Sequence, residues 1–164
     1  MTSEDIPPGV RRVRKALAEA GLGDGVRRHP EGTRTAADAA RAVGCPVGAI
    51  VKSLVFMAGG EPLLVLTSGA NRVDVDALAA HLGRPVRRAA ASEVRVATGF
   101  AIGGVPPLGH PRPLVTLADP ALMLYDVVWA AAGTPDTVFP AAPADLLRAC
   151  GASQAPPEVF QPQP

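Results

Sequence analysis

Lys52 is the residue whose type and surroundings point most directly to chemistry. The chain has fourteen arginines but only two lysines, Lys15 and Lys52. Lys15 belongs to a polar helical stretch, whereas Lys52 interrupts a β-branched, apolar run typical of a half-buried strand, IVKSLVF over residues 50–56. A compact ammonium in such a strand is unfavourable unless it has a partner or a ligand. Lys52 is therefore either an edge-strand lysine that reaches water or the cation of a binding site.

A glycine- and proline-rich segment is the second candidate. Residues 98–110 read TGFAIGGVPPLGH, which is too apolar for a flexible linker. Pro106 and Pro107 stiffen the segment, while Gly103 and Gly104 allow positive φ and close backbone approach. Such a loop can direct backbone N–H groups at an anion or a carbonyl oxygen. The glycine spacing matches neither a Walker A loop nor a dinucleotide-binding fingerprint, and a rigid turn without a ligand is the alternative.

The remaining reactive side chains form no recognisable catalytic or metal-binding pattern. Cys45 and Cys150 are far apart and form no CxxC, and the three histidines lack ligand spacing. No serine lies in a G-x-S-x-G motif. His110 is a candidate base or a structural residue, and Cys45 fits a buried thiol better than a nucleophile. We therefore expect neither a metal nor a cofactor.

Composition limits the classes of partner. The chain has 164 residues, 48% of them hydrophobic and 19% charged, with a net charge of +1. These values indicate one globular domain and exclude a strongly basic, sequence-indifferent nucleic-acid binder. Two local basic clusters, residues 11–15 and 84–88, remain candidates for phosphate contacts or for solvated surface. No apolar stretch reaches membrane-spanning length, so we expect a cytoplasmic protein with no membrane or DNA partner.

The elements that would position these residues mix short helices with hairpin-linked strands, which indicates an α+β fold. Periodicity and capping residues predict helices over 10–20, 36–43, 75–82, 92–97 and 143–150. The predicted N-terminal caps are Thr35, a cap at or beside Asp74, and Ser92. Strands are predicted over 26–29, 50–57, 63–67, 86–89, 114–117 and 127–131. The expected domain covers residues 10–151, after a flexible N-terminus over 1–9. Residues 152–164, rich in Pro and Gln, are expected to form a disordered tail.

Four segments in order carry a resemblance to a known family: VKSLVF over 51–56, SGANRVD over 68–74, the loop over 98–110, and AAG over 131–133. This order and spacing resembles the YbaK/ProX family of aminoacyl-tRNA deacylases, the free-standing relatives of the editing domain of prolyl-tRNA synthetases. The resemblance runs from about Gly32 to Gly151. It implies a single compact α+β domain, with short helices around a mixed, barrel-like β-sheet.

The resemblance also implies a reaction and its partners. The family performs trans-editing, in which the ester that joins a wrong amino acid to the terminal ribose of a tRNA is hydrolysed. The implied partner is the 3′ acceptor end of an aminoacyl-tRNA, with an aminoacyl-tRNA synthetase as a second candidate. A small amino acid is the expected substrate, because a synthetase rejects a smaller competitor poorly, whereas a small editing pocket excludes the larger correct one.

Site residues carry over from the family position by position. The strand lysine falls on Lys52, and its neighbour, often threonine in the family, falls on Ser53. The substrate-facing glycine loop falls on Gly103, Gly104, Pro106 and Gly109, although Pro106 stands where the family often has serine. Lys52, Gly103 and Gly104 are therefore expected in catalysis. The expected substrate-binding residues are Ile50, Ser53, Phe56, Val105, Pro106, Gly109, His110 and Gly133.

Two other classes of function stay open from the residues alone. One is a non-catalytic tRNA- or synthetase-binding module of the same fold. The other is an enzyme that forms a Schiff base through Lys52 with a carbonyl compound. The sequence determines neither the amino acid, the tRNA, the general base nor the oligomeric state. Asp136 lies out of register with an acidic position of the family and receives no role.

Overall fold

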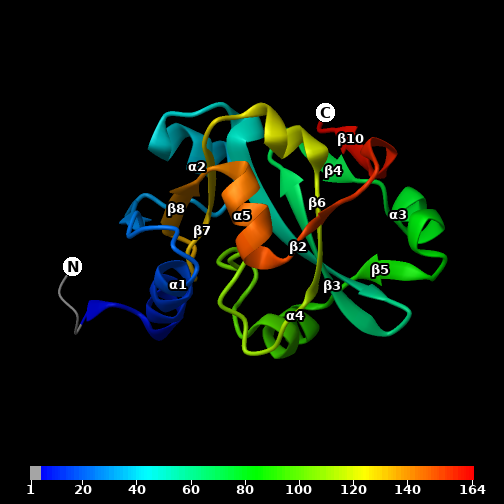
Figure 1. The fold of residues 1–164 in the computed structure, drawn as a ribbon, viewed down its shortest axis with the longest axis horizontal. Helices are drawn as coiled ribbons and strands as arrows, with labels where there is room; N and C mark the ends of the chain where they lie inside the picture. Colours follow the sequence, from blue (N-terminus) through cyan, green and yellow to red (C-terminus); the bar gives the residue numbers. More distant parts are fainter. Residues whose placement is uncertain (1–4) are drawn as a thin grey trace.

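The fold was taken from a computed structural model, which describes residues 5–164. These residues form one mixed sheet, a separate strand pair and five α-helices around them (Figure 1). The predicted single α+β domain with a mixed sheet is thereby confirmed. The helices are α1 Pro8–Glu19, α2 Ala36–Val43, α3 Val75–Leu82, α4 Ala91–Thr98 and α5 Pro143–Cys150. The strands are β1 Arg27–Arg28, β2 Ile50–Ala58, β3 Glu61–Ser68, β4 Asn71–Val73, β5 Val86–Arg88, β6 Val115–Ala118, β7 Val128–Ala131, β8 Thr137–Ala141, β9 Ser153–Gln154 and β10 Phe160–Pro162.

Capping residues set the helix boundaries that the sequence predicted. The Thr35 hydroxyl accepts a hydrogen bond from the Asp38 N–H at 3.0 Å at the start of α2. α2 ends at Gly44, which adopts the left-handed conformation. Asp74 and Gly83 bound α3 in the same way.

The predicted cap at Ser92 is wrong, because α4 begins at Ala91. Ser92 therefore lies inside the helix, in its first turn. The carboxylate of Glu93 supplies the capping contact by accepting a hydrogen bond from the Ala90 N–H at 2.8 Å. A glutamate at the third helical position can satisfy this donor without a Ser or Thr cap.

β2 is the central strand of the sheet, and one of its edges is open in the middle. The main sheet runs in the order β1-β8-β7-β2-β3-β6-β9, and β5 also pairs with β2. β3 pairs with β2 along residues 51–58. On the other edge, β7 pairs only with residues 50–51 and β5 only with residues 56–58. In the described chain, no strand therefore pairs with this edge of β2 at residues 52–54.

Alternate residues of β2 and β3 divide the interior into two apolar clusters. The larger cluster contains Val51, Val55, Leu64 and Leu66, and it is completed by α1, α5 and the glycine- and proline-rich loop. The smaller cluster lies on the opposite face of β2 and β3 and packs against α3 and the C-terminal segment. Its residues include Phe56, Leu63, Val65, Leu78, Val159 and Phe160. This alternation sends Lys52 and Ser53 to opposite faces of β2.

The expectation of a disordered tail over 152–164 is wrong. β9 pairs in parallel with β6. β10 pairs antiparallel with β4 (Figure 1). Ala155, Val159 and Phe160 are buried, so three apolar side chains anchor the segment. A composition rich in Pro and Gln hides these anchors when only the local sequence is considered.

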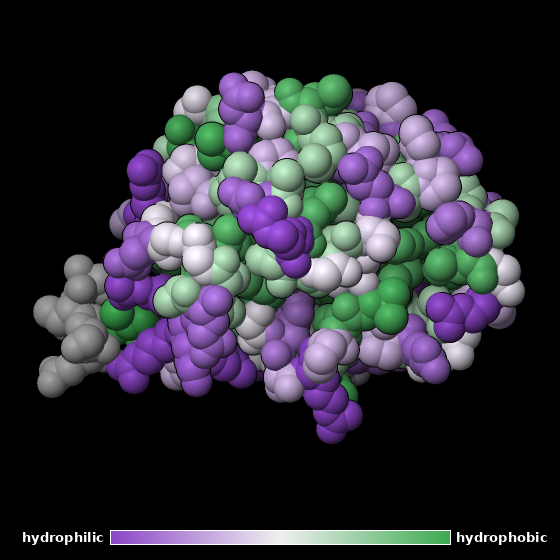
Figure 2. Space-filling view, in the orientation of Figure 1, coloured by the Kyte–Doolittle hydropathy of each residue, from purple (hydrophilic) through white to green (hydrophobic). Residues whose placement is uncertain are grey.

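The N-terminal boundary of the domain also moves. Residues 1–4 of the expected flexible N-terminus, 1–9, lie outside the described residues. Pro8 and Gly9 already belong to α1, where Pro8 suits the first helical position. Strongly hydrophilic side chains cover the region of α1 on the face drawn in Figure 2. Among the described residues, no helix has the length and apolar character that crossing a membrane requires.

Candidate functional site

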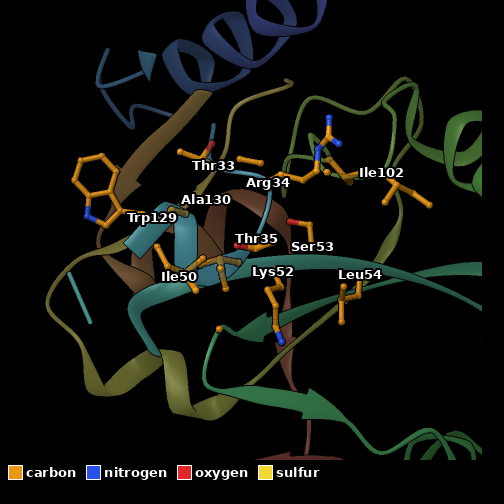
Figure 3. Close-up of a pocket in the computed structure, with 18 of the residues that line it drawn as sticks. Thr33, Arg34, Thr35, Ile50, Lys52, Ser53, Leu54, Ile102, Trp129 and Ala130 are labelled. Atoms are coloured by element: carbon orange, nitrogen blue, oxygen red, sulfur yellow. The ribbon is translucent and has the colours of Figure 1, made fainter. Parts of the chain in front are cut away.

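A cavity of about 1000 Å³ lies against the open edge of β2. Its walls come from α2 with the preceding loop, from β7, from the end of β5 and from the glycine- and proline-rich loop (Figure 3). Residues 52–54, which lack a strand partner on this edge, all line the cavity. The cavity therefore exists because β7 and β5 pair with the two ends of β2 and leave its middle uncovered.

Ser53 presents an unused hydroxyl at this opening. Figure 3 shows its side chain directed to the opposite side of β2 from Lys52. Its Oγ is buried and has no hydrogen-bond partner among the described residues. A buried polar atom without a partner is unfavourable, so a ligand that hydrogen-bonds to it would gain binding energy.

Lys52 is held by a backbone carbonyl on the neighbouring strand β4. Its Nζ donates a hydrogen bond to the Asn71 carbonyl oxygen. The Asn71 side chain donates to Asp119 at 2.9 Å, and the buried Asp119 also accepts from the Ser68 N–H at 3.1 Å. Burial, followed by the nearby charge of Arg88, lowers the pKa of Lys52, while Asp119 opposes the shift. Lys52 is thus a half-buried cation with a partner and not a lysine that simply reaches water.

The charged side chains that line the cavity all have the same sign. They are Arg34, Lys52 and Arg88, and no Asp or Glu is among the described residues that line it. None of the described histidines lines the cavity either. The site therefore favours an anionic ligand and offers no conventional general base from its walls.

The glycine- and proline-rich loop contributes only its first part to the cavity. Ile102, Gly103 and Val105 line the cavity, and Gly103 has a φ of +95°, which favours glycine. Gly104 is buried against the backbone of Thr134, and its N–H donates to the Ala101 carbonyl at 3.1 Å. The loop is therefore packed into the protein and exposes a short stretch of backbone to the site.

His110, at the end of this loop, contacts two other residues of the same loop. Its Nε2 lies 2.8 Å from the Pro106 carbonyl oxygen, and its ring meets the edge of Phe100 at 6.3 Å between centroids. Burial lowers the pKa of His110, although the contact with Pro106 opposes the shift. The imidazole lies outside the cavity lining and braces the loop.

Five of the predicted site residues line the cavity. They are Ile50, Lys52, Ser53, Gly103 and Val105. Six others do not line it: Phe56, Gly104, Pro106, Gly109, His110 and Gly133. Phe56 is fully buried in the smaller apolar cluster. At Gly133, an added Cβ would lie 2.7 Å from the Gly9 backbone, so this glycine allows α1 to pack closely.

Sequence reasoning missed Arg34, Trp129 and Gln163, which also line the cavity. Arg34 stands in a polar loop before α2, where a single arginine carries no distinctive local signal. Trp129 is the only tryptophan of the chain, and the Arg27 guanidinium lies 5.1 Å from its ring centroid. Gln163 follows β10, and its N–H donates to the Ala70 carbonyl at 2.8 Å.

The two basic clusters are largely engaged within the protein. Arg12 donates to the Gly99 carbonyl at 3.1 Å and lies over Phe100, and Arg14 pairs with Asp24 at 3.1 Å. In the second cluster, Arg87 makes two hydrogen bonds to Glu93, at 2.7 and 2.8 Å. Contact of these clusters with tRNA stays a prediction. Among the described residues of both clusters, only Arg88 lines the cavity.

Substituting Gly104 by alanine is expected to destabilise the fold by about 1–3 kcal/mol. The added Cβ would lie 2.9–3.1 Å from three backbone atoms of Thr134, and neither segment can move without disturbing the core. Chemical denaturation measures the loss. Ile102→Ala is the control in the same loop, because Ile102 is 60% exposed, and its effect should stay within about 0.5 kcal/mol. Equal stability of both variants would contradict the packing role of Gly104.

Comparison with known proteins identifies the family. Residues 30–149 match the family model described as the aminoacyl-tRNA editing domain, which spans more than half of the chain. The chain belongs to this family. The match contains β2, the cavity-lining residues Arg34, Lys52 and Arg88, and the glycine- and proline-rich loop. It ends before the C-terminal segment that forms β9 and β10.

Solved structures agree with this assignment of the editing domain. A protein described as a candidate trans-editing enzyme for prolyl-tRNA synthetase is 49% identical, with a TM-score of 0.86, and the alignment covers 92% of this chain and 97% of the other. A chain from a study that grafted epitopes onto scaffold proteins is 44% identical, with a TM-score of 0.85 and the same coverage. A hypothetical protein is 29% identical, with a TM-score of 0.81, over 92% and 99% of the two chains. Comparison with curated proteins gave no match.

Proposed function

We propose that this editing domain is a trans-editing hydrolase that deacylates mischarged aminoacyl-tRNA carrying a small amino acid. The observation that carries the proposal is the cationic cavity at the open edge of β2, which brings Lys52, Ser53 and Gly103 together. The family match and the 49% identical relative support the substrate class. The cavity of about 1000 Å³ has room for the terminal nucleoside as well as the aminoacyl group.

The reaction adds water across the ester between the amino acid and a ribose oxygen. Water attacks the carbonyl carbon, the bond to the ribose oxygen breaks, and the ribose regains its hydroxyl as the amino acid leaves. An ester is already activated, so the protein mainly has to polarise the carbonyl and position the water. In this proposal, backbone around Gly103 and the Ser53 hydroxyl contact the ester on one side of β2. The Lys52 ammonium, which lies on the other side of the strand (Figure 3), reaches the substrate at the open edge.

The lining of the cavity favours a base supplied by the substrate. No Asp, Glu or His is among the described residues that line it. The terminal ribose carries a free hydroxyl on the carbon next to the ester, so the substrate has its own group that can direct the attacking water. We therefore assign the role of activating or directing the water to the tRNA terminus, with the protein providing charge and shape.

Deacylation of a panel of mischarged tRNAs tests the proposal. The purified protein is expected to hydrolyse at least one tRNA that carries a small amino acid, and turnover should persist after treatment with a chelator. Release of the labelled amino acid measures the rate against the spontaneous rate. Binding to the same tRNAs without hydrolysis would instead support the non-catalytic module, and loss of activity on chelation would refute a mechanism in which the protein supplies only charge and shape.

A further inference from the structure

Two exposed arginines stand at the cavity without a carboxylate partner. Arg34 precedes α2, and Arg88 ends β5, so the two come from separate walls of the cavity. Both are exposed although they line it, which places them at its rim. Among the described residues, neither guanidinium has an ion pair or a side-chain hydrogen bond. Arg88 lies 5.8 Å from the centroid of the Phe56 ring, and the Arg34 side chain packs beside Gly103.

Arg34 and Arg88 differ in this respect from six other arginines in the chain. Six arginines form ion pairs with carboxylates: Arg14 with Asp24, Arg28 with Asp136, Arg41 with Asp38, Arg84 with Glu61, Arg87 with Glu93, and Arg148 with Asp145. Arg87 and Arg88 are neighbours on β5, yet only Arg87 has a carboxylate partner among the described residues. The two arginines at the cavity are therefore free to bind an external anion.

Phosphate is the anion that the proposed RNA substrate would bring to this rim. A planar guanidinium matches the oxygen geometry of a phosphate and binds it with two hydrogen bonds. The third cation, Lys52, already donates to the Asn71 carbonyl. Asp119, whose charge reaches Lys52, is buried and accepts hydrogen bonds from Ser68, Asn71 and Ala121. No Asp or Glu side chain is among the described residues of the lining.

We propose that Arg34 and Arg88 form a phosphate-binding pair at the rim of the cavity, which holds the phosphodiester groups of an RNA strand next to the aminoacyl ester. The inference rests on the proposed function, which identifies the RNA as the aminoacyl-tRNA whose ester enters the same cavity. It assigns the arginines to binding, as positioning residues, and leaves the chemical step to the open edge of β2. Their loss should raise KM and leave kcat nearly unchanged.

Binding of an RNA hairpin with an acceptor stem and a CCA 3′ end, but without an esterified amino acid, tests the pair directly. Fluorescence anisotropy at several salt concentrations is expected to show about ten-fold weaker binding for Arg34→Gln and for Arg88→Gln. Each substitution should also reduce the slope of log affinity against log salt by about 0.7. Arg41→Gln on α2 and Arg148→Gln on α5 remove arginines that pair with a carboxylate and do not line the cavity. As controls, they should stay within about two-fold of the unmodified protein.

Two aminoacyl ester substrates distinguish a failure of the phosphate pair from a failure of the proposed deacylase function. The arginine variants should lose activity on the charged RNA hairpin but retain it on the same amino acid esterified to adenosine, which has no phosphate. Equal loss on both substrates, or unchanged RNA binding, would overturn the phosphate pair. If the unmodified protein cleaves neither ester while RNA binding still depends on Arg34 and Arg88, the proposed function fails and the pair stands.

A second set of variants guards against loss of folding. Thermal unfolding checks each glutamine variant, and both positions are exposed, so small shifts are expected. Arg34→Lys and Arg88→Lys keep the charge and remove the planar fork. They should preserve the salt slope while binding RNA with intermediate affinity. Lysine variants that bind as weakly as the glutamine variants, with the same loss of salt slope, would overturn the assignment.

Discussion

Substituting Phe160 by alanine is expected to lower the free energy of unfolding by about 3–5 kcal/mol. Phe160 is 7% exposed and packs in the smaller apolar cluster with Phe56, Leu78 and Val159. It also pairs with Val73 in the β10–β4 ladder. Removing the ring leaves a cavity in a cluster that β2, β3 and α3 share, so the surroundings can collapse only partly. Urea denaturation followed by circular dichroism measures the loss.

Gln161→Ala is the matched control, because Gln161 occupies the next position of the same strand and is only partly buried. Its effect should stay within about 0.5 kcal/mol. If Phe160→Ala were equally mild, the C-terminal segment would not be part of the core. Gln163 and Pro164 follow this strand and line the cavity, so Phe160→Ala is also expected to weaken substrate binding.

Helix boundaries were predictable where one residue caps each end. Thr35 and Gly44 bound α2, and Asp74 and Gly83 bound α3, because a side-chain oxygen and a left-handed glycine are local determinants. The short strands β4, β9 and β10 were not predicted. Each has only two or three residues and exists because a distant segment supplies its partner, and local periodicity carries no such information.

The site was predictable to the extent that residue type and the family resemblance reveal function. Lys52 stood out because an ammonium in an apolar strand is unfavourable without a partner or a ligand, and Ser53 was carried over from the family resemblance. Arg34 could not be found in this way, since the cavity arises from β5 and β7 pairing with opposite ends of β2. Gly103 and Gly104 are indistinguishable in sequence, yet one lines the cavity and the other packs on Thr134.

Substituting Lys52 by alanine is expected to reduce kcat/KM for deacylation by about ten- to a hundred-fold. This loss corresponds to one charge-assisted hydrogen bond to the substrate, which contributes roughly 1.5–3 kcal/mol. Lys52 lines the cavity at the open edge of β2, where the ester is proposed to lie. The free energy of unfolding should change by less than about 1 kcal/mol, because losing the hydrogen bond to Asn71 and relieving a buried ammonium beside Arg88 act in opposite directions. Deacylation rates and thermal midpoints are measured together.

Lys52 also predicts a pH dependence with a definite sign. Its pKa in the folded protein is below the usual value of 10.5, so the unfolded chain binds the proton more tightly. The contribution of Lys52 to the free energy of unfolding therefore rises as the pH increases from the folded pKa toward the unfolded one. The Cys150 thiol, whose pKa burial raises to about 12, contributes with the opposite sign, so the Lys52 contribution is read from the difference between the unmodified protein and Lys52→Ala. Over the same range the enzyme-catalysed rate, corrected for spontaneous hydrolysis, should fall as the ammonium is lost. Both dependences should disappear in Lys52→Ala.

Lys52→Arg separates charge from shape at this position. A guanidinium keeps the positive charge, but it is larger and planar and cannot take the place of the ammonium against the Asn71 carbonyl. We therefore expect at most partial rescue of deacylation, and little further loss of charge as the pH rises, because arginine stays protonated. Near-normal activity in both Lys52→Ala and Lys52→Arg would make Lys52 a structural residue that holds β4 to β2. The catalytic charge would then have to come from elsewhere in the cavity.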